Sequence, residues 1–171
     1  YSSRYPALLA GKASPVLDHA FAGGALMDIN LYNIHFVVGL FGAPKSVRYF
    51  PNRHSTGVDT SGTLLLEYDG FMCHCIGAKD CAARNSVQIV GEDGNLIVTP
   101  SSSNCQCVEL NLRNQPQQTV ALTENPWYYE VQDIGAIITA GDLSGCHKAL
   151  DTTLQVVAVL EQARAYAKFN F

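Results

Sequence analysis

Three side chains that can exchange protons recur along one predicted helix near the N-terminus. Asp28, Tyr32 and His35, followed by Gly39, are spaced by four, three and four residues, so a helix places them in one narrow stripe. Apolar residues border this stripe on both sides, Met27, Leu31, Ile34 and Val38 on one and Ala25, Ile29, Phe36 and Leu40 on the other. Buried polar groups must be paired or serve a function. By the pattern alone a structural role is favoured, in which Asp28 caps or pairs and Tyr32 is an amphipathic core residue.

The helix that carries this stripe is predicted from the period of its apolar residues. It starts after Gly23-Gly24 and ends near Gly42, because apolar side chains recur at steps of four and three between these points. Gly42, followed by Pro44, is typical of a helix C-terminus. His35 lies on this helix too, and for it a structural histidine is the favoured interpretation over a substrate contact.

The middle of the chain has the pattern of β-strands, and two helices follow it. Asp69-Gly70 and Asp93-Gly94 are typical of two-residue hairpin turns. This order predicts a single α+β domain over residues 1–171, with one open, mainly antiparallel sheet of about five or six strands and helices packed on one face. The expected strands are 46–50, 63–68, 71–76, 87–91, 95–99, 105–112 and 118–122, and the expected helices are 127–140 and 147–166.

Charge and hydropathy disfavour several classes of partner. The net charge is −4 and the eleven Lys and Arg are scattered singly, so no basic stripe is predicted to neutralise nucleic-acid phosphates. We expect no membrane span, since no apolar run approaches about 20 residues. The first residues resemble no signal peptide, and a cytoplasmic protein with reduced thiols is therefore expected.

Two cysteine pairs, Cys73-His74-Cys75 and Cys105-Gln106-Cys107, raise the question of a metal site. In a strand, alternation places Cys73 and Cys75 on one face and His74 on the other. Zinc sites favour cysteines two to four residues apart on turns, where the chain folds the ligands around the ion. Small thiols packed in the sheet are therefore the favoured interpretation, and no metal is predicted.

A few aromatic and basic residues could contact a substrate. Trp127 and Tyr128 could line a carbohydrate pocket by stacking, or equally anchor the following helix to the sheet. Arg48 could reach a polar substrate, although a lone arginine on a strand is more often simply solvated.

Several segments, taken in order, resemble one family. Residues 23–32, Gly-Gly-Ala-Leu-Met-Asp-Ile-Asn-Leu-Tyr, resemble the signature that opens the C-terminal domain of the glucose–fructose oxidoreductase / inositol dehydrogenase / MocA family, with Asn30 where that family usually has Gly. Residues 40–44, Leu-Phe-Gly-Ala-Pro, resemble its helix-ending motif. Gly57-Val58-Asp59 before the hairpin strands and the Gly91–Gly94 turn are similar to further family features.

This resemblance implies an activity and a missing part. It places Tyr32 and Asp28 at the positions of the family's acid–base pair. It also implies NAD or NADP as cofactor, bound with an active-site lysine by an N-terminal Rossmann domain. Neither the Gly-rich phosphate turn nor the Glu-Lys-Pro motif of that domain occurs in this sequence. We therefore expect the fragment alone to bind no dinucleotide and to be inactive.

The expected full-length function is hydride transfer between nicotinamide and a sugar, polyol or related cyclic alcohol. In it, this domain supplies most of the substrate pocket. The strands carry apolar residues in both phases, so a homodimer through the sheet face is expected. The alternative is a catalytically idle assembly or ligand-binding module of the same fold.

Overall fold

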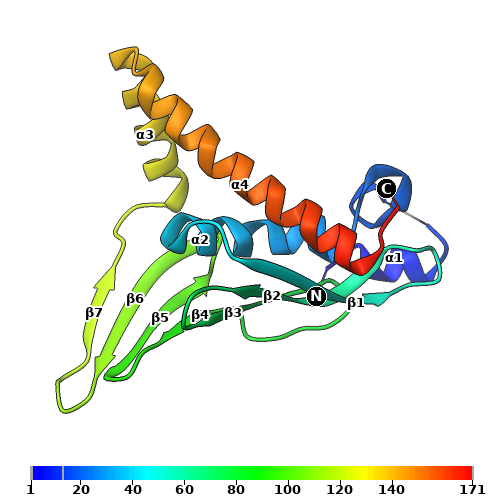
Figure 1. The fold of residues 1–171 in the computed structure, drawn as a ribbon, viewed down its shortest axis with the longest axis horizontal. Helices are drawn as coiled ribbons and strands as arrows, with labels where there is room; N and C mark the ends of the chain where they lie inside the picture. The colour runs from blue at the N-terminus through cyan, green and yellow to red at the C-terminus, as the bar shows by residue number, and fades with distance from the viewer. Residues whose placement is uncertain (1, 13, 171) are drawn as a thin grey trace. The chain divides into compact units, whose positions relative to one another are not determined.

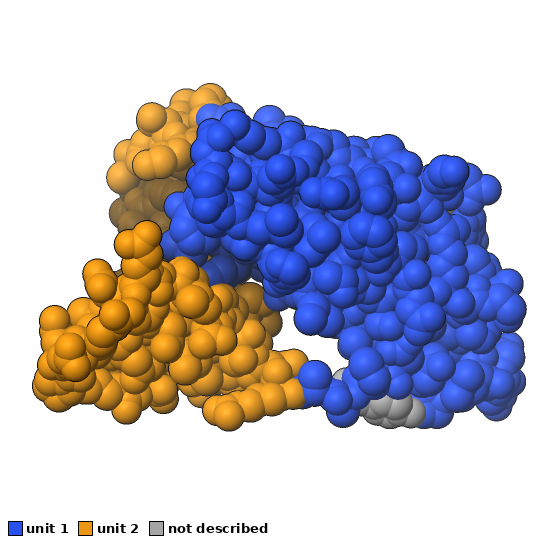
Figure 2. Space-filling model, turned by 60° about the horizontal axis from the view of Figure 1, so that its bottom comes forward, with its two compact units in different colours: residues 1–83, 150–171 blue, residues 84–149 orange. Residues whose placement is uncertain are grey.

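The computed structural model describes residues 2–12 and 14–170, which form two compact units. Unit 1 comprises residues 1–83 and 150–171, and unit 2 comprises residues 84–149; Figure 2 colours them separately. Unit 1 therefore contains both ends of the chain, and unit 2 is one continuous stretch between them.

Unit 1 combines a three-stranded antiparallel sheet with helices (Figure 1). Its sheet has the order β1-β2-β3. The β2–β3 hairpin turns at Asp69-Gly70, as predicted, where the Tyr68 N–H donates to the Phe71 carbonyl over 3.0 Å and Gly70 has a φ of +82°. Its elements are α1 (Tyr5–Leu9), the short helical turns η1 (Pro15–Leu17), η2 (His19–Phe21) and η3 (Leu26–Asn30), α2 (Leu31–Phe41), β1 (Ser46–Arg53), β2 (Asp59–Glu67), β3 (Met72–Ala78) and the later part of α4 (Leu143–Ala167).

Unit 2 contains a four-stranded antiparallel sheet of order β4-β5-β6-β7, with α3 and the first residues of α4. Its β4–β5 hairpin closes with the Gly91 N–H donating to the Gly94 carbonyl over 2.9 Å, so the two loop residues are Glu92 and Asp93, one position before the predicted pair. The Asn125 side chain caps α3 by accepting from the Trp127 N–H, and Gly141 ends it with a φ of +61°. Its elements are β4 (Val87–Val90), β5 (Gly94–Ser101), β6 (Asn104–Leu112), β7 (Gln118–Ala121) and α3 (Pro126–Ala140).

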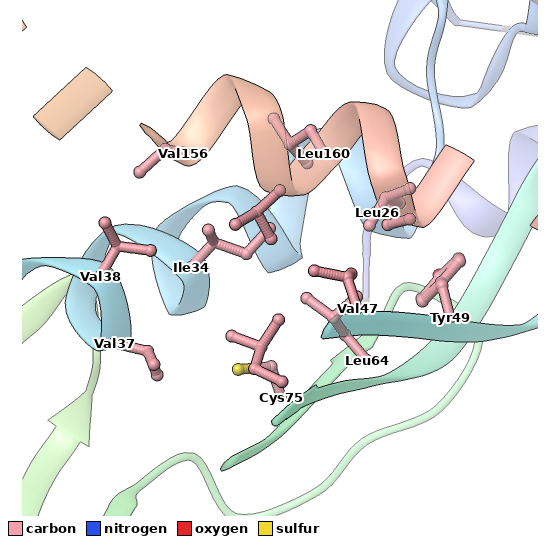
Figure 3. Packing of buried hydrophobic residues seen from close by; sticks show 13 residues of the cluster. Leu26, Ile34, Val37, Val38, Val47, Tyr49, Leu64, Cys75, Val156 and Leu160 are labelled. Atoms are coloured by element: carbon pink, nitrogen blue, oxygen red, sulfur yellow. The ribbon is translucent and has the colours of Figure 1, made fainter. Parts of the chain in front are cut away.

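The core of unit 1 lies between one face of the β1–β3 sheet and the helices above it. Alternation along the strands directs Val47, Tyr49, Leu64, Leu66 and Cys75 to this face. These side chains pack with a second set from the helical elements: Leu26, Ile34, Val37 and Val38, with Val156, Val159, Leu160 and Ala163 from α4. Figure 3 shows part of this packing, with Ile34, Val156 and Leu160 on the helical side and Val47 and Leu64 on the strands. The last twenty residues of the chain therefore complete a core that begins near residue 26.

Glycines make room for polar side chains where the chain enters the first long helix. Gly24 has a φ of +135°, and a Cβ there would lie 1.9 Å from Asp59 Oδ1. A Cβ on Gly62 would lie 2.2 Å from Tyr49 Oη. Both positions exclude a side chain, so Asp59 and the Tyr49 hydroxyl can occupy the space beneath η3.

The structure confirms the α+β class, the antiparallel strands and helices on one face of the first sheet. It differs in that seven strands form two sheets rather than one sheet of five or six. The pairing stops after β3, since residues 79–86 lie outside the strands and β4 pairs only with β5. The pattern also missed α1 and the turns η1 and η2, which lack the length to show a period, whereas η3 lies within the predicted helix.

One stretch corrects the expectation about membrane spans. The helical segment His19–Phe41 is long and apolar enough to cross a membrane by length and composition alone. In the structure its apolar residues Leu26, Ile34 and Val38 are buried in the core of unit 1, and 33% of the apolar window is buried.

The glycine at position 62 gives a stability prediction. Gly62→Ala should lower the free energy of unfolding by roughly 1–3 kcal/mol, because the new methyl group collides with the buried Tyr49 ring. Gly39→Ala is the matched control: no atom lies within 4 Å of its Cβ position, and the helix interior should gain about 0.5–1 kcal/mol. Urea unfolding of both variants measures the difference, and an unchanged midpoint for Gly62→Ala would contradict the packing described.

Candidate active site

Asp28 forms an ion pair with a buried lysine. Asp28 lies in η3, and its Oδ2 accepts a hydrogen bond from Lys79 Nζ, which follows the end of β3. The Lys79 side chain is 2% exposed, whereas that of Asp28 is 41% exposed. A buried ammonium requires a partner because removal from water is costly, and Asp28 supplies it. The exposed part of this pair is thus a carboxylate whose position is held from the protein interior.

Tyr32 lies on the turn after Asp28 and also reaches solvent. It is 51% exposed, and His35 and Gly39 farther along α2 are exposed as well. The predicted stripe is therefore an accessible surface of this chain, with Asp28 at its half-buried end. A carboxylate and a phenol on one accessible stripe are suited to bind and exchange protons with a hydroxyl group.

The segment that carries Asp28 is a π-helical turn, Leu26–Asn30, which continues directly into α2. Such turns are rare and frequently occur at functional sites. The sequence period did not reveal this turn, because it is only five residues long.

A buried carboxylate anchors the start of this turn. Asp59 Oδ2 accepts from the Leu26 N–H over 2.7 Å and from the Tyr49 hydroxyl over 2.6 Å. Burial raises the pKa of Asp59, although the hydrogen bonds from Tyr49 and Leu26 act against this. Burial, together with the adjacent Asp59 charge, also raises the pKa of Tyr49, so this phenol stays protonated and donates to the carboxylate.

Asn30, the departure from the family signature, ends the π-turn as a fully buried residue. Its Oδ1 accepts from Asn33 Nδ2 over 2.9 Å. A Cβ on Gly77 would lie 2.9 Å from Asn30 Cγ, and Gly77 pairs with Gly62 across β2 and β3. The larger side chain at position 30 is therefore accommodated by a strand position that has none.

The structure places Arg48, another predicted substrate contact, away from Asp28 and Tyr32. Arg48 lies on β1 between Val47 and Tyr49, which face the core, so it lies on the opposite face of the sheet. There Arg48 Nη2 lies 3.4 Å from Glu67 Oε2. Trp127 and Tyr128 belong to unit 2, where they are 70% and 51% exposed at the start of α3.

The cysteine pairs lie in strands, with the alternation that was predicted. Cys75 is buried, Cys73 is partly buried and His74 is exposed on the other face of β3. Burial raises the pKa of Cys75 to about 12, and a protonated thiol is not a metal ligand. Within residues 2–12 and 14–170, no three His, Cys, Asp or Glu side chains lie close enough together to hold a metal ion.

The residues of this chain do not fit a dinucleotide. All strands in the described part of the chain pair antiparallel, so no parallel βαβ unit places a helix N-terminus for a pyrophosphate. The described strands therefore form no Rossmann-type site for a pyrophosphate.

The fold is shared with solved oxidoreductase structures. One is the aldose-aldose oxidoreductase from Caulobacter crescentus, with a TM-score of 0.71 and 20% identity, covering 91% of this chain and 50% of that one. A second is the oxidoreductase yvaA from Bacillus subtilis, with a TM-score of 0.64 and 18% identity, covering 86% of this chain and 49% of that one. At these identities the likeness concerns the fold alone.

Residues 2–97 match the family model for the GFO/IDH/MocA C-terminal domain. The chain belongs to the GFO/IDH/MocA family, as the motifs around residues 23–44 predicted.

Curated relatives are dehydrogenases by name. The chain is 31% identical over 166 residues to scyllo-inositol 2-dehydrogenase (NADP(+)) IolU of Bacillus subtilis, covering 96% of this chain and 50% of that protein. It is 45% identical over 56 residues to human trans-1,2-dihydrobenzene-1,2-diol dehydrogenase, covering 32% of this chain and 17% of that protein. The chain spans about half the length of the first of these relatives.

Asp59 gives a prediction about pH. The pKa of Asp59 in the folded protein is raised above its unfolded value of 3.8. The protonated form therefore favours the folded state, and this stabilisation is fully present below pH 3.8 and is lost as the pH rises through the folded pKa. Relative to an Asp59→Asn variant, the wild-type free energy of unfolding should therefore fall from about pH 4 upward. Urea unfolding of both proteins across this range measures the trend.

A second variant tests the cause of the shift. Tyr49→Phe removes a hydrogen bond that lowers the pKa of Asp59, so the loss of stability should extend to higher pH. A constant difference between wild type and Asp59→Asn at every pH would show that Asp59 does not titrate in this way.

Proposed function

We propose that the full-length protein is an NAD- or NADP-dependent oxidoreductase whose substrate is a sugar, polyol or related cyclic alcohol. The observation that carries this proposal is the pairing of an anchored, half-exposed carboxylate with an exposed tyrosine on one helix, in a chain of the GFO/IDH/MocA family. When bound, the nicotinamide coenzyme accepts or donates the hydride. The residues of this chain orient the substrate and move the proton.

Tyr32 is the proton-transferring residue in this proposal. When an alcohol is oxidised, its hydroxyl proton must pass to a base, and the phenol oxygen of Tyr32 lies on the accessible stripe. A free phenol has a pKa of about 10, so a tyrosine that works near neutral pH needs a neighbouring cation. The resemblance assigns this role to the lysine of the coenzyme domain, so the isolated fragment is expected to be inactive.

Asp28 has the orienting role. Its negative charge disfavours a phenolate nearby, so it is unsuited to activate Tyr32. A carboxylate with one oxygen held by Lys79 can accept a hydrogen bond from a substrate hydroxyl through the other. Asp28 would then fix the alcohol so that the reacting hydroxyl faces Tyr32.

The substrate class follows from the site chemistry together with the names of relatives. An inositol and a dihydrobenzenediol are both cyclic alcohols with neighbouring hydroxyl groups. Two hydroxyls on adjacent carbons match a site with two oxygen-bearing side chains, one for the reacting hydroxyl and one for its neighbour. We infer a cyclic diol or polyol as the substrate of the full-length protein.

We also propose that the outer face of the β1–β3 sheet is an interface between two copies of the protein. Met72 and Ile76 are exposed on this face and Leu65 is partly buried there, beside the Arg48–Glu67 pair and His74, while the helices cover the opposite face. Exposed apolar side chains grouped on one face are typical of an association surface.

The role of Tyr32 is tested by Tyr32→Phe in the full-length enzyme. Turnover should fall by about 10²–10⁴-fold, the usual contribution of a general acid–base group, while coenzyme affinity and the unfolding temperature stay unchanged. Nicotinamide absorbance with scyllo-inositol and with a trans-dihydrodiol as substrates measures the rate. Tyr166→Phe, a half-exposed tyrosine on α4, is the matched control and should keep wild-type turnover.

Near-normal turnover of Tyr32→Phe would show that another group transfers the proton. If the wild-type protein shows no absorbance change with any cyclic alcohol, the idle module becomes the better explanation.

The interface is tested by light scattering. The wild-type protein should have the mass of a dimer or higher oligomer, and Ile76→Lys should shift it toward the monomer, because a charge would be buried in the interface. A strictly monomeric wild type at high concentration would contradict the interface.

A further inference from the structure

We propose that Lys79 is a positioning residue of the active site, which holds Asp28 from the protein interior so that the remaining carboxylate oxygen is presented to the substrate. This inference rests on the proposed function. It adds to the site a lysine that belongs to this domain and is distinct from the one that the family resemblance places in the coenzyme domain.

The backbone of Lys79 is fixed on both sides. Its N–H donates to the Thr60 carbonyl over 2.7 Å, which continues the β2–β3 pairing by one residue. Its carbonyl accepts from the Ser2 N–H over 2.9 Å. Strand alternation from Cys75 through Gly77 places the Lys79 side chain on the face that η3 covers. The ammonium group therefore has little freedom to follow Asp28 if the carboxylate moves.

Burial is distributed unequally between the two partners. Lys79 is enclosed along its whole side chain, so its ammonium has almost no access to water, while nearly half of the Asp28 side chain is exposed. Among the residues that the structure describes, Asp28 is the acidic side chain within ion-pair distance of Lys79. Because water has almost no access to the Lys79 ammonium, its electrostatic interaction with Asp28 is weakly screened.

Asp59, the buried acid of this region, already accepts hydrogen bonds from other residues. Asp59 accepts from Leu26 and Tyr49, and these bonds fix the start of the π-turn. Lys79 fixes Asp28, two residues farther along the same turn. The two contacts constrain both the backbone and the side chain of the segment that carries the proposed substrate carboxylate.

A purely structural role for Lys79 makes a different prediction. Buried ion pairs are often no more stabilising than apolar residues of the same volume, so a methionine could fill this space. If the charge serves only the fold, its removal changes stability but leaves the chemistry of Asp28 intact. If it positions Asp28, its removal lowers catalysis only while Asp28 is present.

The test is a double-mutant cycle in the full-length enzyme with Lys79→Met, Asp28→Asn and the double variant. The substrates are scyllo-inositol and a trans-dihydrodiol, and the coenzyme is NADP or NAD. Lys79→Met should lower kcat/KM by about 10–100-fold, the size expected when a reacting group is misplaced, and leave the coenzyme Kd unchanged. In the Asp28→Asn background the same change should alter kcat/KM less than about twofold.

Lys45→Met is the matched control. It also removes a lysine that pairs with an aspartate, Asp69, but both side chains of that pair are exposed, at 61% and 84%. Its kcat/KM should equal that of the wild type.

Thermal unfolding provides a second measurement. Asp28→Asn leaves a buried ammonium unpaired, so its Tm should fall below that of the double variant, in which both charges are removed. If Lys79→Met does not fold, Lys79→Gln replaces it in the cycle.

The outcomes separate the two proposals. An active wild type whose Lys79→Met variant keeps full kcat/KM, or loses it equally with and without Asp28, overturns the positioning role and leaves the proposed function standing. A wild type with no activity toward any cyclic alcohol overturns the proposed function, and with it the role of Lys79.

Discussion

The start of the helix that carries the candidate site depends on one buried carboxylate. Asp59 accepts two hydrogen bonds through a single oxygen, one from the backbone of Leu26 and one from the Tyr49 hydroxyl. The first ties the π-turn to the beginning of β2, and the second ties β2 to β1 on the core face. If Asp59 were replaced by an apolar residue, the buried Leu26 N–H and the buried Tyr49 hydroxyl would each lose a hydrogen bond, and such a loss is costly in a protein interior.

This constraint explains why glycines occur where they do. A carboxylate, a phenol and an amide beneath a helix need more space than apolar side chains packed against a flat sheet. Gly24, Gly62 and Gly77 supply that space, each at a position where a Cβ would lie closer than 3.0 Å to one of these polar groups. Of the two glycines in the family-like signature, Gly24 makes room for Asp59, whereas a Cβ on Gly23 would meet the backbone of residues 15–18.

Much of the fold could be predicted from the sequence, and the reasons for the failures are physical. The helix ending at Gly42 and the turn at Asp69-Gly70 follow from local periods and turn chemistry, and both are present. Two sheets in place of one could not be predicted, because hydrophobic alternation specifies strands but not which strands pair. The π-turn escaped notice because five residues are too few to show a change of period.

Only part of the candidate site could be predicted from the sequence. Asp28 and Tyr32 were found through their spacing and the family motif. Lys79 was missed, because the predicted strand 71–76 ends three residues before it and Lys79 follows the end of β3. Its pairing with a residue 51 positions earlier depends on how the hairpin meets the helix, and no local pattern records that.

The distribution of unit 1 over both ends of the chain has a consequence for how the protein forms during synthesis. The first 83 residues contain the sheet and the helix of the candidate site, but α4 contributes Val156, Val159, Leu160 and Ala163 to the same core. Until these residues leave the ribosome, the apolar layer of unit 1 lacks part of its cover. Such contacts between distant segments slow folding, and exposed apolar surface in partly made chains promotes aggregation. A nascent chain stopped before residue 156 would therefore be a substrate for chaperones, even though every residue of the candidate site has already been made.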